Sequence, residues 1–198
     1  ISPIYEPGLD EIIKKNYKAG RLIFTSNLKI AIKNSEIIFI CVGTPNKKNS
    51  QEVDLKYIFN SIKEISNSTK KKRIIVTKST VPVGTGDKIE FIFKKKRKKN
   101  FSVISNPEFL REGEAIRDFR YPDRIVVGSN SKETFKVMKK IYQPLINKGA
   151  TFFMTSRRGA ELIKYASNAF LATKITFINE LANLCEKAKI NVEDIALG

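Results

Sequence analysis

The stretch that decides the fold class is Ile37-Ile38-Phe39-Ile40-Cys41-Val42, followed directly by Gly43-Thr44-Pro45. Six consecutive apolar residues are typical of a strand that is covered on both faces, as strands in parallel sheets are. The glycine and proline that follow predict a turn at the end of the strand. Five further short segments rich in Ile, Val and Phe are strand candidates: Leu22–Thr25, Ile74–Lys78, Val103–Ser105, Ile125–Gly128 and Phe152–Met154.

Amphipathic stretches separate these strand candidates, and apolar residues at helical spacing predict helices there. The apolar stripes are Leu9, Ile12, Ile13 and Tyr17; Leu55, Ile58, Phe59, Ile62 and Ile65; and Phe135, Met138, Ile141, Tyr142 and Leu145 behind Ser131. Asp54 is the expected N-cap of the second helix. Alternation of strands and helices predicts an α/β fold in which a doubly wound, mostly parallel sheet carries helices on both faces.

The C-terminal part of the chain differs from the rest. From Gly159 to Lys189 there is no proline, and apolar residues recur at helical spacing. A helix of this length would extend roughly 46 Å at 1.5 Å per residue. Apolar residues occur on nearly all of its faces, so we expect another domain or a second subunit to cover much of it.

Composition excludes several kinds of chemistry. The chain of 198 residues has no histidine, which rules out Ser-His-Asp and Cys-His catalysis and His-ligated zinc. Its two cysteines, Cys41 and Cys185, are too few for a four-ligand metal site, so we predict no metal. They do not form a disulfide scaffold either, and a cytoplasmic location is expected. No apolar run approaches the ~18–20 residues that span a bilayer, so no membrane association is expected.

The net charge of +17 raises the possibility of nucleic-acid binding. The densest basic runs are 94–99 and 70–73, each at the expected end of a helix, where cations offset the helix dipole. They have no interleaved aromatic residues, and no nucleic-acid-binding motif is present. We therefore predict solvated turns and no dedicated nucleic-acid binding, although the positive field suits anionic ligands.

Three loops should carry the chemistry, because ligands bind beyond the carboxyl ends of parallel strands. They begin with Gly43-Thr44-Pro45, Lys78-Ser79-Thr80 and Asn106-Pro107-Glu108. In the third loop, Glu108 precedes Phe109 and Leu110, so partial desolvation would suit it to proton transfer, whereas the alternative is a glutamate that caps a turn. Glu112 would lie one helical turn further on and could face the same space.

Two further features of the sequence have two possible interpretations each. Lys164 and Asn168 share a face of the long helix and could stabilise a developing oxyanion, or be a snorkelling lysine beside an exposed asparagine. Gly84-Thr85-Gly86 resembles the start of a dinucleotide fingerprint, but Ile89 occupies the third glycine position. The residues alone thus indicate an α/β fold that binds an anion or nucleotide without the usual phosphate loop.

Several motifs, in order along the chain, together resemble the UDP-glucose/GDP-mannose dehydrogenase family. They are Ile1-Ser2-Pro3-Ile4-Tyr5-Glu6-Pro7-Gly8-Leu9, Val42-Gly43-Thr44-Pro45, Lys78-Ser79-Thr80-Val81-Pro82-Val83-Gly84-Thr85, Asn106-Pro107-Glu108-Phe109-Leu110-Arg111-Glu112-Gly113, Pro122-Asp123-Arg124-Ile125-Val126 and the segment 160–174. Within this family the motifs favour UDP-glucose as the substrate, with GDP-mannose and UDP-N-acetylmannosamine left open.

The resemblance implies a partial Rossmann-like NAD-binding domain over residues 1–156 and the start of a central helical dimerisation domain over 157–198. It implies NAD-dependent oxidation of UDP-glucose to UDP-glucuronate in two steps, and a homodimer formed through the 159–189 helix. The implied NAD-binding residues are Val42, Gly43, Thr44, Pro45, Ser79, Thr80 and Glu112. The implied catalytic residues are Glu108, Thr80, Lys164 and Asn168, and substrate contacts come from Glu108, Phe109, Leu110, Arg111, Lys164 and Asn168.

The resemblance also sets an expectation about activity. The family's phosphate-binding glycine loop and ribose-binding acid would precede residue 1, and its catalytic cysteine segment would follow residue 198. Neither Cys41 nor Cys185 has the context of that cysteine. We therefore expect the 198-residue chain alone to show little or no activity. The alternative hypothesis is a non-catalytic remnant that acts at most as a dimerisation or nucleotide-binding module.

Overall fold

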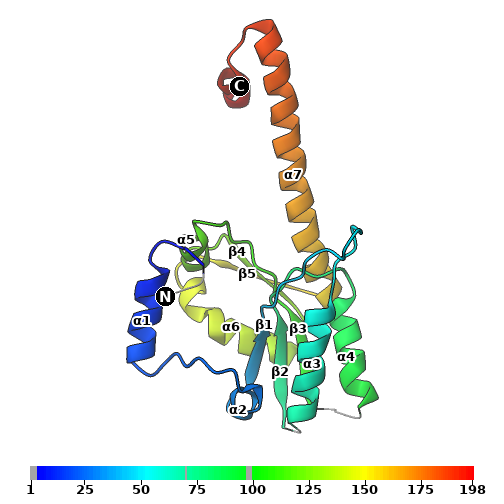
Figure 1. Ribbon diagram of the computed structural model, residues 1–198. Coiled ribbons are helices and arrows are strands. Elements are labelled where there is room, and N and C mark those ends of the chain that lie inside the picture. The colour runs from blue at the N-terminus through cyan, green and yellow to red at the C-terminus, as the bar shows by residue number, and fades with distance from the viewer. Residues whose placement is uncertain (1–3, 70, 97–99) are drawn as a thin grey trace. The chain divides into compact units, whose positions relative to one another are not determined.

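The computed structural model describes residues 4–69, 71–96 and 100–198 (Figure 1). Its strands form one sheet in the order β1-β2-β3-β4-β5. They are β1 (Ile37–Ile40), β2 (Arg73–Thr77), β3 (Phe101–Ser105), β4 (Arg124–Gly128) and β5 (Thr151–Thr155). All pairings are parallel except that of β3 with β4, which is antiparallel and joins Ser105 to Gly128. The mostly parallel α/β fold expected from the sequence is confirmed.

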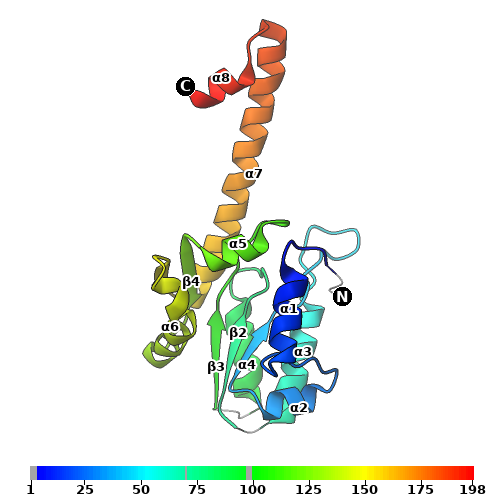
Figure 2. The same ribbon diagram turned by 90° about the vertical axis from the view of Figure 1, so that its left-hand side faces the viewer.

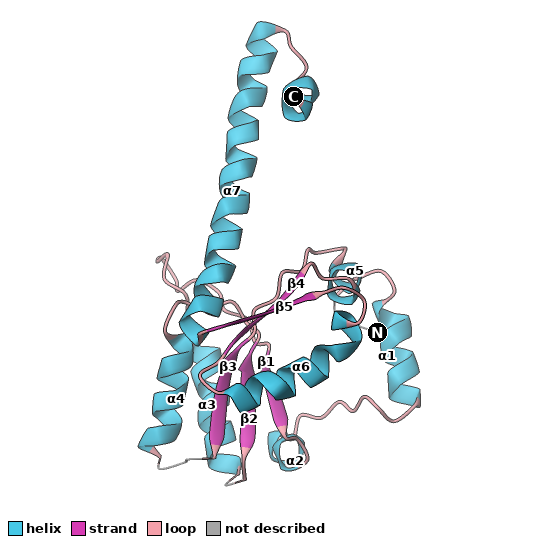
Figure 3. Ribbon diagram, turned by 180° about the vertical axis from the view of Figure 1, so that it is seen from behind, coloured by secondary structure: helices cyan, strands magenta, loops and turns pink. Residues whose placement is uncertain are grey.

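The helices are α1 (Leu9–Lys18), α2 (Leu28–Lys33), α3 (Lys56–Ser68), α4 (Thr85–Lys95), α5 (Ala115–Arg120), α6 (Lys132–Ile146), α7 (Arg157–Ala188) and α8 (Val192–Leu197). Helices α3 to α6 connect successive strands, α1 and α2 precede β1, and α7 and α8 follow β5. Apolar residues of α2, α3 and α4 pack with Ile75 and Val103 on one face, and Met138 of α6 packs with Val76 and Ile104 on the other. Figure 3 shows α6 crossing the sheet on the face opposite α3 and α4.

The predicted strand at Leu22–Thr25 is wrong. These residues lie in an irregular segment between α1 and α2, with Ile23 77% and Phe24 64% exposed. A short strand is stable only when a neighbouring strand pairs with it, and no residue that the structure describes does so here. The composition of the segment thus indicates β propensity, but such a segment forms a strand only where another strand pairs with it.

Two predictions about charged residues need correction. The N-cap of α3 is Leu55 rather than Asp54, although the Asp54 carboxylate accepts a hydrogen bond from the Lys56 amide at 2.8 Å. The basic run 70–73 is not wholly a solvated turn, because Arg73 is 5% exposed and its Nε donates to the Ile32 carbonyl oxygen at 3.2 Å. A buried guanidinium at the C-terminal end of α2 satisfies carbonyl groups that the helix leaves unpaired. Residues 70 and 97–99 of the two basic runs lie outside the described residues.

The chain divides into two compact units, Ile1–Leu162 and Ile163–Gly198. The first contains the sheet and the beginning of α7, and the second contains the remainder of α7 together with α8. The long helix predicted over 159–189 is confirmed as α7, whereas α8 was not predicted. Within the described ranges, no helix combines the length and apolar character that crossing a membrane requires.

Candidate functional site

The three loops singled out in the sequence leave the same edge of the sheet. β1, β2 and β3 are parallel, with Ile40 paired to Thr77 and Thr77 paired to Ser105 at their carboxyl ends. Figure 2 shows β2 and β3 side by side, with the loops that follow them at the same end. The register therefore brings to one place residues that are 28 to 36 positions apart in sequence.

A cavity of about 190 Å³ lies where these loops meet. It is lined by Cys41, Val42, Gly43, Thr44, Lys78, Ser79, Thr80 and Glu108. We call Val42, Gly43, Thr44, Ser79, Thr80 and Glu108, which are also predicted site residues, the strand-end rim. The predicted site residues Pro45 and Glu112 are not among the lining residues, and both are exposed.

The rim hydroxyl groups are held by main-chain carbonyl groups from neighbouring loops. Thr44 Oγ1 donates to the Thr80 carbonyl oxygen at 3.0 Å, and Ser79 Oγ donates to the Val42 carbonyl oxygen at 2.7 Å. A hydroxyl has one hydrogen and two lone pairs, so donation to a carbonyl group leaves its oxygen able to accept. Such oxygens suit a ligand that presents hydroxyl or amide donors, as the ribose and carboxamide groups of NAD do.

Glu108 is half-buried, and its Oε2 accepts a hydrogen bond from the Leu110 amide at 2.5 Å. The carboxylate therefore caps a turn of its own loop, which was the simpler of the two sequence interpretations, while it also lines the cavity. The expected helical turn from Glu108 to Glu112 is wrong, because α5 begins only at Ala115. Residues 106–111 have no regular secondary structure, and Glu112 is exposed.

Lys78, which was not among the predicted site residues, lines this cavity as well. Its Nζ donates to the carbonyl oxygens of Asn106 and Pro107, at 3.4 and 3.3 Å. The signal available in the sequence was its position, since it is the first residue after β2 and begins one of the three loops. Burial raises the pKa of the neighbouring Cys41 thiol, and the Lys78 cation only partly offsets this. Cys41 is therefore a protonated thiol at neutral pH and is unsuited to be a nucleophile.

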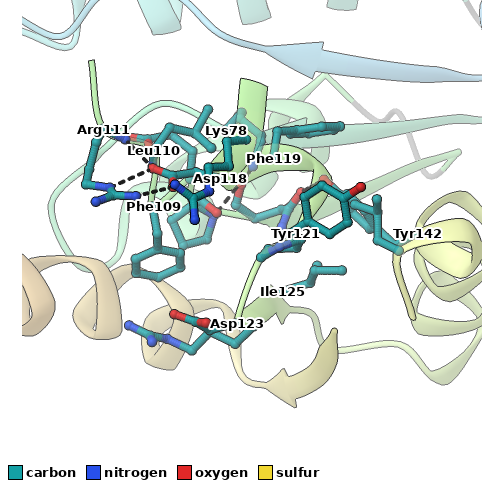
Figure 4. Close-up of a pocket in the computed structure, with 17 residues that line it drawn as sticks. Lys78, Phe109, Leu110, Arg111, Asp118, Phe119, Tyr121, Asp123, Ile125 and Tyr142 are labelled. Atoms are coloured by element: carbon teal, nitrogen blue, oxygen red, sulfur yellow. Dashed lines mark hydrogen bonds and ion pairs between the residues drawn. The ribbon is translucent and has the colours of Figure 1, made fainter. Parts of the chain in front are cut away.

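A second cavity of about 540 Å³ adjoins the loop that follows β3 (Figure 4). Glu108 and Lys78 line both cavities, and the predicted substrate contacts Phe109, Leu110 and Arg111 line this one. Arg111 forms a bidentate ion pair with Asp118, with Nη2 to Oδ1 at 2.7 Å and Nε to Oδ2 at 3.0 Å. Hydrogen bonds from Arg111 lower the pKa of Asp118 to about 2.

Phe109 also has a cationic neighbour in this cavity, because the Arg124 guanidinium lies 4.7 Å from the centroid of its ring. This contact orients the aromatic side chain through the electrostatic attraction between the cation and the ring face. The wall therefore combines an apolar ring with the guanidinium groups of Arg124 and Arg111, the second of which is paired with Asp118.

Lys164 and Asn168 belong to α7 within the second unit, Ile163–Gly198. They are four residues apart, so they share one face of the helix as predicted from spacing. Lys164 is buried and Asn168 is exposed. Neither is among the residues that line the two cavities described above, all of which lie in the first unit.

A separate polar cluster holds the first turns of α7 to the sheet and α4. The Glu161 carboxylate is 3% exposed and accepts hydrogen bonds from the Gly84 amide at 2.6 Å, the Gly86 amide at 2.8 Å and Ser105 Oγ at 3.0 Å. Arg157 Nη2 lies 2.7 Å from carboxylate oxygens of both Asp87 and Glu90. We call this cluster the α4–α7 junction: Gly84, Gly86, Asp87, Glu90, Ser105, Gly128, Arg157 and Glu161.

The junction explains the glycines of Gly84-Thr85-Gly86. Gly84 has a φ of +90°, which favours glycine. A Cβ on Gly86 would lie 3.0 Å from Glu161 Oε1. The two glycines allow the main chain to receive a buried carboxylate, so their resemblance to a dinucleotide fingerprint does not reflect cofactor binding.

Comparison with known proteins is consistent with this geometry. The NAD-binding domain of the UDP-glucose/GDP-mannose dehydrogenase family matches residues 1–146, and the central domain of the same family matches residues 158–198. The chain therefore belongs to the UDP-glucose/GDP-mannose dehydrogenase family, and its cofactor is NAD. The family resemblance recognised in the sequence is confirmed.

Individual relatives carry related names. Over 199 residues the chain is 49% identical to a UDP-glucose 6-dehydrogenase of Rhizobium meliloti, covering 99% of this chain and 46% of that protein. It is 52% identical to a UDP-glucose 6-dehydrogenase of Rickettsia felis, covering 100% of this chain and 44% of that protein. The chain thus spans less than half the length of these curated relatives.

Solved structures of related enzymes share the fold. A ternary complex of GDP-mannose dehydrogenase from Pseudomonas aeruginosa matches with a TM-score of 0.92 at 34% identity, over 98% of this chain and 46% of that one. A UDP-glucose dehydrogenase from Pyrobaculum islandicum matches with a TM-score of 0.90 at 35% identity, over 98% of this chain and 45% of that one. These matches support the Rossmann-like architecture expected for the first unit.

Proposed function

We propose that this chain supplies the NAD-binding part of an NAD-dependent UDP-glucose 6-dehydrogenase, which oxidises UDP-glucose to UDP-glucuronate in two steps. The observation that carries the proposal is that Glu108 lines both cavities, the strand-end cavity and the larger one beside it. A proton-transfer group must reach both cofactor and substrate, and a residue shared by two adjoining cavities meets that requirement. The names of the relatives supply the substrate class.

The rim residues have distinct roles in this proposal. Val42, Gly43 and Thr44 hold NAD, with Ser79 and Thr80 at its nicotinamide end, where hydroxyl oxygens accept hydrogen bonds from the ligand. NAD⁺, when bound, supplies the hydride acceptor. Pro45 and Glu112, which the resemblance also assigns to NAD, do not line the cavity, and we give them no direct contact.

Glu108 carries the proton chemistry in this proposal. Its carboxylate, held by the Leu110 amide, takes part in proton transfer at the sugar and activates the hydrolytic water, which Thr80 helps to orient. Phe109, Leu110 and Arg111 contact the nucleotide sugar from the wall of the larger cavity. Lys164 and Asn168 would stabilise negative charge on the sugar oxygen.

Titration of the 198-residue chain with NAD⁺ by isothermal calorimetry tests the cofactor site. Thr44→Val removes one hydroxyl from the rim, and we expect the affinity for NAD⁺ to fall about three- to tenfold. The matched control is Thr151→Val, which removes an exposed hydroxyl that lines neither cavity and leaves the affinity unchanged. Absence of NAD⁺ binding by the parent chain, or equal affinities of Thr44→Val and the parent, would contradict the proposal.

The same chain, mixed with NAD⁺ and UDP-glucose, tests the expectation about activity. We expect no appreciable reduction of the nicotinamide, because the resemblance places both the phosphate-binding glycine loop and the catalytic cysteine segment outside residues 1–198. Formation of NADH at a rate proportional to chain concentration would show that this expectation is wrong.

Cytoplasmic location and the lack of dedicated nucleic-acid binding remain predictions.

We also propose that the 159–189 helix forms a homodimer. Large apolar side chains of α7 within the second unit are exposed, including Phe170 at 67% and Phe177 at 64%. Paired apolar faces of this kind are typical of subunit interfaces. Light scattering after size exclusion should report a dimer that Phe170→Glu dissociates and that Asn179→Asp, an exposed polar substitution on the same helix, leaves intact. A monomeric parent chain would contradict the proposal.

A further inference from the structure

We infer that Tyr142 is a positioning residue for Glu108, acting through the buried side chain of Asn106. The inference rests on the role proposed for Glu108 above. It concerns how the loop after β3 is held, and it assigns a role to a residue of α6 that does not line the strand-end cavity.

The side chain of Asn106 is fixed at both ends. Tyr142 Oη donates to Asn106 Oδ1 at 2.6 Å, and Asn106 Nδ2 donates to the Val126 carbonyl oxygen at 2.8 Å. Asn106 is 1% exposed and Tyr142 is 6% exposed, so water does not substitute readily for either partner. This side chain therefore links the end of β3 to α6 on one side and to β4 on the other.

The main chain of the same residue is fixed as well. The Asn106 amide donates to the Thr77 carbonyl oxygen at 2.9 Å, and Lys78 Nζ lies 3.4 Å from the Asn106 carbonyl oxygen and 3.3 Å from that of Pro107. The ring of Pro107 fixes its own φ. Few free torsions remain between the end of β3 and Glu108, so the position of Asn106 sets that of Glu108.

Tyr142 is suited to be a permanent donor in this arrangement. Burial raises the pKa of its phenol to about 12, so the hydroxyl keeps its proton throughout the neutral range. Loss of that hydroxyl would leave Asn106 Oδ1 buried without its donor. The nearest relief is rotation of the Asn106 side chain, which would also release the bond to Val126 and loosen the loop.

Hydrogen exchange measured by NMR on the 198-residue chain tests the inference. The reporter is the Leu110 amide, because it donates directly to the Glu108 carboxylate. In Tyr142→Phe we expect this amide and the Asn106 side-chain NH₂ to exchange about tenfold faster, as loss of one buried hydrogen bond allows. Amides of Ile75 and Val76 in β2 should change by less than about twofold.

The matched control is Tyr121→Phe, which removes a hydroxyl from an exposed tyrosine that lines the same large cavity as Tyr142. It should leave the Leu110 amide unchanged. Lys78→Met removes the ammonium group that donates to the Asn106 and Pro107 carbonyl oxygens, and it should speed exchange of the Leu110 amide about threefold. Unchanged Leu110 exchange in Tyr142→Phe, or equal acceleration of the β2 amides, would overturn the inference.

Calorimetry separates this inference from the proposed function. Tyr142→Phe should bind NAD⁺ within about twofold of the parent, because Glu108, the group that Tyr142 positions, carries proton chemistry and is assigned no contact with NAD. If the parent chain binds no NAD⁺, the proposed function fails while the exchange result still decides the role of Tyr142. If NAD⁺ binds normally and Leu110 exchange does not respond, only the positioning role fails.

Discussion

The strand-end rim and the α4–α7 junction are both rich in polar groups, yet these groups are satisfied differently. At the rim, Thr44 and Ser79 are half-buried and line a cavity, and their hydroxyl groups donate to main-chain carbonyl groups, so the hydroxyl oxygens remain able to accept. At the junction, the buried Glu161 carboxylate accepts three hydrogen bonds and Arg157 bridges two carboxylates. The rim keeps acceptor capacity for a ligand, whereas the junction uses its capacity internally to hold the fold.

The largest expected effect comes from filling the closest approach at the junction. A Cβ on Gly128 would lie 2.6 Å from both the Ala160 Cβ and the Ser156 carbonyl oxygen. Main-chain atoms cannot move away cheaply, so Gly128→Ala should lower the free energy of unfolding by about 3 kcal/mol in urea denaturation. A loss under about 1 kcal/mol would show that the junction is looser than its contacts indicate.

Removal of the buried carboxylate is expected to have the next largest effect. Glu161→Ala leaves the Gly84 and Gly86 amides and Ser105 Oγ without their acceptor, which should cost about 2 kcal/mol of unfolding free energy. Glu161→Gln retains one acceptor oxygen and should cost less. Calorimetry on the folded fraction should give an unchanged affinity for NAD⁺, and a matching loss of affinity would mean that the two regions are coupled.

Substitution of a rim glycine should have the opposite effect: it should leave stability unchanged and lower the affinity for NAD⁺. A Cβ on Gly43 meets nothing within 4 Å, so Gly43→Ala should change the unfolding free energy by less than about 0.5 kcal/mol. The added methyl group stands at the cavity wall, and we expect the affinity for NAD⁺ to fall on the order of fivefold. Reduced stability with unchanged affinity would remove the distinction between rim and junction.

The smallest effect concerns the exposed pair Arg111–Asp118, the counterpart of the buried Arg157 cluster. Hydrogen bonds from Arg111 hold the pKa of Asp118 at about 2, so the stabilisation is complete above the ordinary value of 3.8 and is lost as the pH falls through about 2. Arg111→Gln should move the Asp118 carboxyl titration, followed by carbon NMR, back toward 3.8. Arg117→Gln is the matched control and should produce a smaller rise, because Arg117 acts on Asp118 only at a distance. An unchanged pKa of Asp118 in Arg111→Gln would contradict the conclusion that Arg111 lowers it.

The rim could be predicted from the sequence because its geometry follows from the strands. Once Ile37–Val42, Ile74–Lys78 and Val103–Ser105 were identified as parallel strands, the residues after each had to meet at one edge. The observed β1, β2 and β3 differ from these ranges by two residues or fewer at each end. Convergence of Thr44, Thr80 and Glu108 on one cavity then needs no information beyond strand order and direction.

The junction could not be predicted in the same way. Gly84 and Glu161 are 77 residues apart, and nothing in the local sequence of either indicates the other. A buried carboxylate beside two glycines depends on where α7 begins, which hydrophobic periodicity does not specify. Arg73 was misread for the same reason, because its partners in α2 are 40 and 41 residues away. Local patterns specify elements and strand ends, whereas isolated long-range hydrogen bonds need the assembled structure.

The position of β1 in the sheet order has a consequence for how the molecule behaves in concentrated solution. Within the described residues β1 pairs with β2 alone, and its outward-facing Phe39 is 38% exposed. A strand with one open side offers a ladder of amide and carbonyl groups to any extended peptide, including the same strand of another molecule. The 198-residue chain taken alone is therefore expected to add to copies of itself edge to edge, and a peptide that occupies that side would keep the copies apart.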